Sequence, residues 1–126
     1  MARVPIIRFG DTLVATVQEA LQDRDALALQ AELAEELERT GARGVLLDVS
    51  VVETVDSFLG RLLSDIATGA RLLGAQTVVV GIQPAVAITL VELGLELKGV
   101  RTALTPEKGL ALLRRPASPN GGRRGR

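Results

Sequence analysis

The fold of this chain is restricted most by short, nearly continuous apolar runs that alternate with longer amphipathic segments. Two of these runs, residues 44–49 and 76–82, have the composition of strands that are buried on both faces. A strand of that kind belongs in the middle of a sheet. Because each run is followed by a segment of helical periodicity, the connections are crossovers and the sheet is mainly parallel.

An opening hairpin and four helices complete the predicted architecture. Two strands, residues 5–9 and 12–17, flank Gly10-Asp11, a two-residue connection suited to a tight turn between antiparallel neighbours. The predicted helices are residues 23 or 25 to about 40, 57–74, 84–94 and 106–113, and the last strand is residues 100–104. We therefore expect an α/β fold with a mainly parallel sheet of four to five strands, an antiparallel N-terminal hairpin strand and about four helices.

The spacing of apolar residues also predicts which face of the first two helices is buried. For the first helix, which Asp23 or Asp25 can cap, the inward stripe is Ala26, Leu29, Leu33 and Leu37. For the second helix it is Phe58, Leu62, Ile66 and either Ala70 or Leu73.

Charge is distributed unevenly along the 126 residues. Residues 1–113 hold ten Lys/Arg and 15 Asp/Glu, a net charge of −5, whereas residues 114–126 hold five arginines and no acidic residue. The second segment is rich in Pro, Gly and Arg and lacks apolar periodicity, so it cannot bury enough surface to offset the entropy lost on ordering. We expect one domain, residues 1–113, and a disordered basic tail, residues 114–126.

The composition excludes several classes of function. The chain has no histidine and no cysteine, which removes imidazole acid/base catalysis, thiol nucleophiles, disulfides and the usual zinc ligands. Its only aromatic side chains, Phe9 and Phe58, are too few for the stacking platforms that bind single-stranded nucleic acid. No apolar run reaches the roughly 20 residues of a membrane span. We expect a cytoplasmic protein with no cofactor or metal and no nucleic-acid or membrane partner.

Asp56-Ser57-Phe58 lies where a buried strand gives way to an amphipathic helix. A serine in that place is a common N-cap, because its oxygen accepts a backbone N–H that would otherwise be unpaired, and spacing alone favours this role for Ser57. The same position suits a phosphate, since the amides and the positive dipole end of a helix stabilise added negative charge. The two roles are compatible.

A second informative stretch, residues 81–94, runs from a strand end through a helix that begins at Pro84 and ends at Gly94. Proline fits the first turn of a helix because that position needs no amide donor. Together, Asp56-Ser57-Phe58 and residues 81–94 resemble the RsbS-type STAS-domain antagonists of the bacterial stressosome, over roughly residues 4–113. The resemblance implies a STAS fold, a phosphorylation switch at Ser57 and a scaffold rather than an enzyme.

The resemblance also implies partners and the residues that contact them. The implied partner-binding residues are Asp56, Ser57, Phe58, Gln83 and Pro84. The implied partners are a switch-type serine kinase, a phosphatase that resets Ser57, and the STAS domains of larger sensor co-antagonists, with the chain as a homodimer and part of a large hetero-oligomer. Unmodified protein would sequester the kinase, and phosphorylation would release it.

Other residues leave alternatives open. Thr54 and Thr89 are also hydroxyl acceptors, but Thr89 lies inside a predicted helix, where its hydroxyl can bond back to the preceding turn, so it is the weaker second candidate. The helix of residues 84–94 carries too many apolar residues for one buried stripe, and we expect some of them to form an exposed patch for self-association or for a related STAS subunit.

Two other functions compete with the scaffold. A freestanding anti-sigma-factor antagonist would share the fold and the serine but bind an anti-sigma factor directly. A receiver-like protein would take phosphate on Asp48, which ends a central strand, with Glu53 and Asp56 in place of a magnesium cluster. The acidic pair and the strand-end lysine of receivers are missing, so we expect Asp48 to anchor a loop.

Overall fold

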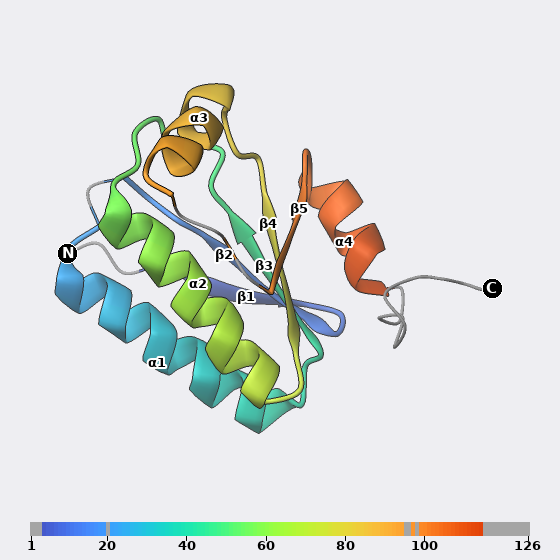
Figure 1. Ribbon diagram of the computed structural model, residues 1–126. Coiled ribbons are helices and arrows are strands. Elements are labelled where there is room, and N and C mark those ends of the chain that lie inside the picture. The colour runs from blue at the N-terminus through green and yellow to red at the C-terminus, as the bar shows by residue number, and fades with distance from the viewer. Residues whose placement is uncertain (1–3, 20, 95–96, 98, 115–126) are drawn as a thin grey trace.

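The computed structural model describes residues 4–19, 21–94, 97 and 99–114 and has nine regular elements in that part of the chain (Figure 1). In chain order they are β1 (Ile6–Phe9), β2 (Thr12–Thr16), α1 (Asp23–Thr40), β3 (Gly44–Asp48), α2 (Ser57–Leu72), β4 (Gln76–Val80), α3 (Pro84–Glu92), β5 (Val100–Ala103) and α4 (Pro106–Arg114).

The sheet follows the order of the sequence, β1-β2-β3-β4-β5. β1 and β2 are antiparallel, and every later neighbour is parallel. Figure 1 shows α1 and α2 across one face of the sheet, α4 against the opposite face and α3 beyond the carboxyl ends of the parallel strands. The predicted α/β fold, with one antiparallel hairpin strand and a central strand at residues 44–48, is confirmed.

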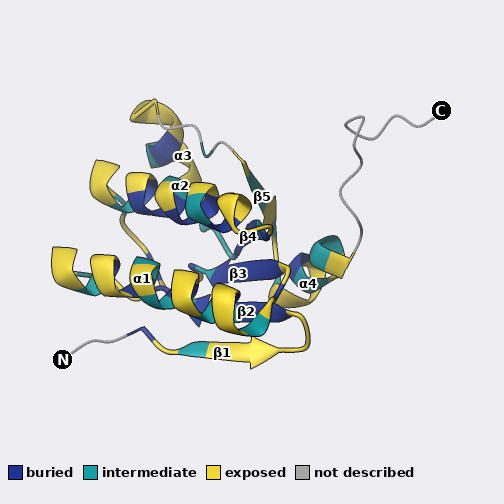
Figure 2. Cartoon of the chain, turned by 90° about the horizontal axis from the view of Figure 1, so that it is seen from below, coloured by how far each residue is buried: buried dark blue, intermediate teal, exposed yellow. Residues whose placement is uncertain are grey.

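Two hydrophobic clusters fill the space on the two sides of the sheet (Figure 2). The larger one joins the inner faces of α1 and α2 to alternate strand residues such as Leu13, Leu47 and Val79. The smaller one packs Leu46 and Val78 beneath α4. Alternating side chains of β3 therefore belong to opposite cores, which is why its sequence is apolar throughout.

The predicted stripe of α1 is confirmed, since all four of its apolar residues are buried. The start of this helix differs from the prediction. The N-cap is Gln22, and Asp25 acts from the third helical position, where its Oδ2 accepts the Gln22 N–H at 3.3 Å. Asp23 is the first helical residue, so neither aspartate is itself the N-cap.

The predicted stripe of α2 is confirmed except at Phe58, and of the two alternatives for its end, Ala70 is the buried one. Leu62, Ile66 and Ala70 are buried, but Phe58 is 38% exposed and Leu73 is 48% exposed. Both lie at the ends of the helix, where neighbouring elements no longer cover the side chain. Gly60, Leu63 and Ala67 complete the buried face instead.

β4 ends two residues before its predicted limit because the chain turns at Gly81. This glycine has φ of +80°, and a Cβ placed there would lie 2.8 Å from the Cβ of Ser50. The β4–α3 connection therefore packs directly on the loop that follows β3, and glycine is required both for the backbone conformation and for the close approach.

The predicted basic tail lies outside the described residues, apart from Arg114, which ends α4. In the described part of the chain, no helix has both the length and the apolar character that crossing a bilayer requires.

One buried hydroxyl gives a test of the packing. Thr77 in β4 is 1% exposed, and its Oγ1 has no hydrogen-bond partner among the residues that the structure describes. A buried polar group without a partner is destabilising, and valine has nearly the same shape as threonine. We expect Thr77→Val to raise the free energy of unfolding by about 1 kcal/mol in urea denaturation.

The matched control is Thr102→Val in β5, where the side chain is exposed. That substitution should change the free energy of unfolding by less than about 0.5 kcal/mol. Equal effects at the two positions, or a loss of stability in Thr77→Val, would contradict this description of the core.

Candidate functional site

The candidate site lies at the carboxyl ends of β3 and β4, where the β3–α2 loop (residues 49–56) leads into α2. Asp56, not Ser57, is the N-cap of that helix, and its Oδ1 accepts the Leu59 N–H at 3.0 Å. This corrects the expectation that Ser57 caps the helix. A carboxylate is at least as good a cap as a hydroxyl, and its charge is favoured at the positive end of the helix.

Because Asp56 takes the capping role, the hydroxyl of Ser57 is left available. Ser57 is exposed and is the first residue of α2. No group in the described part of the chain forms a hydrogen bond with its side chain. An exposed, unengaged hydroxyl on a rigid helix end can enter the active site of another enzyme and accept a phosphoryl group.

The carboxylate of Glu19, just after β2, holds the middle of the β3–α2 loop. Its Oε2 accepts the Glu53 N–H at 2.8 Å and the Thr54 N–H at 3.1 Å. These hydrogen bonds, the one from Glu53 first, keep the pKa of the Glu19 carboxyl below its usual value. Glu19 could not be recognised from the sequence, because nothing local marks a contact across 34 residues.

The start of the same loop is held from the other side. The Ser50 N–H donates to Oδ1 of Asp48 at 2.9 Å, which confirms the expectation that Asp48 anchors a loop. The Gln83 side chain donates from Nε2 to the Ser50 carbonyl at 2.8 Å. Gln83, the residue before α3, and the segment that carries Ser57 are thus connected through the loop, at one end of the molecule.

Phe58 projects between two surface hollows of about 330 Å³ each. One hollow lies toward Glu19 and the loop, and the other lies between the first turns of α1 and α2. A partly exposed aromatic ring beside an accessible hydroxyl is suited to anchor a partner protein, because aromatic residues are enriched at the centres of interfaces.

The other candidate acceptors are engaged. The Thr89 hydroxyl donates to the Ala85 carbonyl at 3.0 Å inside α3, as expected from its position in a helix. The Thr54 hydroxyl lies 3.4 Å from Oε2 of Glu19. Among the three hydroxyls considered, Ser57 has the geometry of an acceptor for a phosphoryl group.

The excess of apolar residues on α3 is visible at the surface. Pro84 starts the helix as expected, Val86 and Leu90 are buried, and Ile88 and Val91 are 60% and 77% exposed. The expected exposed apolar patch is therefore present on the outer side of this helix. In the described residues, no group of three or more acidic side chains is arranged to hold a metal ion.

A family model described as STAS domain matches residues 4–108. The chain belongs to the STAS domain family. A serine-to-glutamate variant of RsbS from Moorella thermoacetica is 42% identical to it with a TM-score of 0.78, over 90% of this chain and 96% of that one. A chain from the molecular architecture of the stressosome, a signal integration and transduction hub, is also 42% identical, with a TM-score of 0.77 over 87% of this chain and 96% of that one.

Two curated proteins from Bacillus subtilis (strain 168) are similar over a shorter stretch. They are the RsbT co-antagonist proteins RsbRA and RsbRD, each 36% identical over 66 and 67 residues, or 52% and 53% of this chain. The chain spans 24% of the length of these two relatives. The resemblance found in the sequence is confirmed, because the RsbS likeness extends over nearly the whole of both chains.

The capping assignment can be tested by stability. Asp56→Ala removes the acceptor for the Leu59 N–H, and we expect it to lower the free energy of unfolding by about 1 kcal/mol. Ser57→Ala should change it by less than about 0.5 kcal/mol, and Asp56→Asn should retain most of the wild-type stability, because asparagine is also a good cap. A larger loss from Ser57→Ala than from Asp56→Ala in urea denaturation would show that the serine is the cap.

The role of Glu19 can be tested by pH. The pKa of Glu19 is lowered in the folded protein. The carboxylate therefore stabilises the loop fully at pH values above its usual pKa of 4.5, and this stabilisation is lost as the pH falls through the folded-state pKa. We expect the amide-exchange protection of Glu53 and Thr54 to decline below about pH 4.5.

Glu19→Gln is the matched control, because its side-chain carbonyl can still accept hydrogen bonds but does not titrate in this range. The protection of the two amides should then be weaker and independent of pH. The same pH dependence in both proteins would mean that another group controls the loop.

Proposed function

We propose that this chain is a phosphorylatable scaffold and negative regulator in a bacterial stress-response pathway that works by partner switching. In its unmodified form it binds and sequesters a serine kinase within a stressosome, and phosphorylation of Ser57 releases the kinase. The observation that carries the proposal is the exposed Ser57 hydroxyl, without a hydrogen-bond partner in the described residues, in a domain 42% identical to RsbS.

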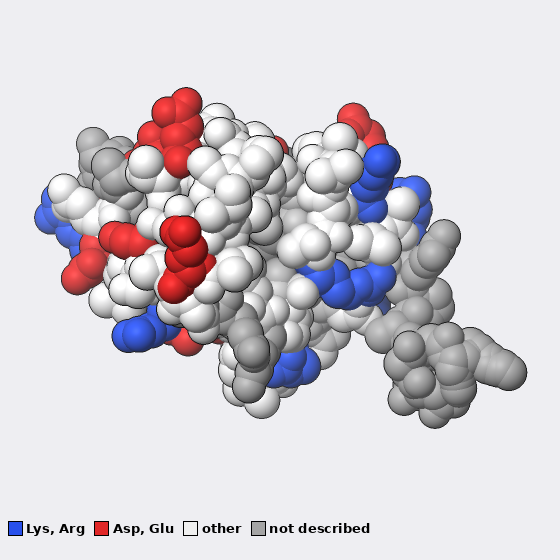
Figure 3. Space-filling model, turned by 45° about the horizontal axis from the view of Figure 1, so that its top comes forward, with Lys and Arg blue, Asp and Glu red and all other residues white. Residues whose placement is uncertain are grey.

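The charges around Ser57 favour release once it is modified. Glu19, Glu53 and Asp56 are exposed acidic residues on the segments that meet near the start of α2. On the face shown in Figure 3, acidic side chains predominate on the left and basic ones on the right. A phosphate adds about −1.5 to −2 charge at neutral pH, and burying it under a docked protein beside other acids costs both repulsion and desolvation.

Release does not require the domain to refold. The contacts that hold the loop and cap the helix are made by Asp48, Glu19, Gln83 and Asp56, and none of them uses the Ser57 hydroxyl. Modification therefore changes the charge and shape of one surface point on a scaffold that keeps its conformation.

The proposed partners follow from the relatives. RsbRA and RsbRD are named as co-antagonists of RsbT, and one of the similar solved chains comes from the molecular architecture of the stressosome. We assign to this chain a switch-type serine kinase, a phosphatase that resets Ser57, and the STAS domains of larger co-antagonists. The exposed Ile88 and Val91 of α3 offer an apolar contact to a second STAS domain, either another copy or a co-antagonist.

In this scheme the kinase supplies the ATP chemistry, and this chain supplies a hydroxyl and a surface. We therefore assign no catalytic activity to it, and we place its work in the cytoplasm, where such a kinase has access to ATP.

The direct test is to incubate the protein with a switch-type serine kinase and ATP and to map the modified residue by mass spectrometry. We expect one phosphate, on Ser57, and none in Ser57→Ala, while Thr89→Ala should be modified like the wild type. Phosphate on Thr89 or Asp48, or continued modification of Ser57→Ala, would contradict the proposal.

Kinase retention tests the consequence of modification. Ser57→Asp should retain less kinase than the wild type in a pull-down, because it adds charge at the docking surface. Ser57→Asn, which has the same shape without the charge, should retain nearly as much as the wild type. Equal retention of the kinase by both variants would mean that negative charge at position 57 does not cause release.

A further inference from the structure

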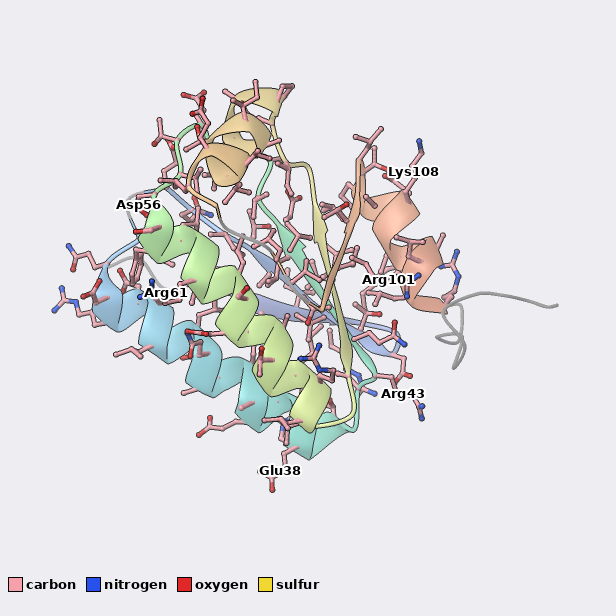
Figure 4. The ribbon with its side chains drawn as sticks, viewed as in Figure 1. Glu38, Arg43, Asp56, Arg61, Arg101 and Lys108 are labelled. Atoms are coloured by element: carbon pink, nitrogen blue, oxygen red, sulfur yellow. The ribbon has the colours of Figure 1, made fainter. Side chains whose placement is uncertain are left out.

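Arg61 is placed to meet a phosphate on Ser57. The two residues are four apart on α2, so their Cβ atoms lie about 5–6 Å from each other on one side of the helix. Both line the hollow of about 330 Å³ between the first turns of α1 and α2. Figure 4 shows Arg61 below Asp56, on the side of α2 that faces α1.

The guanidinium of Arg61 is uncommitted in the unmodified protein. Among the described residues it has no ion-pair or hydrogen-bond partner. Asp65, one turn further along α2, and Asp23, across the hollow on α1, line the same space without pairing with it. By contrast, Arg39 forms a salt bridge with Glu36 of its own helix.

We propose that Arg61 binds the phosphoryl group of Ser57 after modification and turns it toward the hollow between α1 and α2. This inference rests on the proposed phosphorylation of Ser57. A guanidinium can donate two parallel hydrogen bonds to phosphate oxygens, which a lysine at the same place cannot reproduce in geometry. The other charged residues that line this hollow in the described structure, Asp23 and Asp65, are acidic, so Arg61 is the favourable contact in this set.

The pairing has a consequence for the switch. Before modification, the surface beside Ser57 presents a free positive charge that an acidic group of the kinase can contact. After modification, the same arginine is occupied by the phosphate. Phosphorylation therefore adds negative charge and also withdraws the one positive side chain that lines this hollow in the described structure.

The test uses protein with phosphoserine placed at position 57 by genetic encoding, so it does not depend on any kinase. The second pKa of the phosphate is followed by ³¹P NMR titration at low salt. Arg61→Gln should raise this pKa by about 0.3, the size expected for one exposed ion pair on a helix, because the dianion loses its cation. Arg61→Lys should lie between the two, and the difference should shrink at about 1 M salt.

Arg71→Gln is the matched control. It removes the same charge from the same helix, at an exposed position about 21 Å along the axis from Ser57, and should leave the phosphate pKa nearly unchanged. Equal shifts in Arg61→Gln and Arg71→Gln, or none in either, would overturn the pairing. Failure of a kinase to modify Ser57 would instead overturn the proposed function and leave this titration unaffected.

Discussion

The arrangement of the site depends on one hydrogen bond, from the Leu59 N–H to the carboxylate of Asp56. The first turn of a helix has amides without internal partners, and some group must accept from them. If Ser57 did so, its oxygen would be held against the backbone and would be less accessible to a kinase. Because the preceding aspartate takes this task, the helix is stable and the neighbouring hydroxyl remains on the surface.

The second constraint is that the loop before Ser57 is held at several points by groups that are distant in sequence. Glu19 accepts hydrogen bonds from two backbone amides of the loop, and the Gln83 side chain donates one to the carbonyl of Ser50. A surface loop fixed in this way presents Ser57 in one orientation without loss of further entropy on binding, which favours recognition by a partner. Under the proposed switch, a chemical change at the Ser57 hydroxyl would therefore alter binding while the STAS domain keeps its fold.

Most of the fold could be predicted because β3 and β4 are buried on both faces and their apolar runs allow few other arrangements. The position of Ser57 at the start of α2 was also predictable. That Asp56 caps the helix instead could not be predicted, because aspartate and serine are about equally good caps and are adjacent in the sequence. Phe58 was assigned inward by periodicity alone, which carries no information on where a helix projects beyond its neighbours. The roles of Glu19 and Arg61 could be recognised only in the structure, since they come from contacts with the loop and from the lining of the hollow.

We propose that phosphorylation of Ser57 changes a surface charge and leaves the fold of the domain intact. The most direct measurement compares backbone amide chemical shifts of the unmodified protein with those of protein carrying phosphoserine at position 57. We expect the large changes to be confined to residues 53–61 and to the part of α1 that lines the hollow beside Arg61, with the amides of β3 and β4 unchanged. Changes that spread through those strands, or a loss of dispersed signals, would contradict the account and would mean that phosphorylation acts by altering the fold.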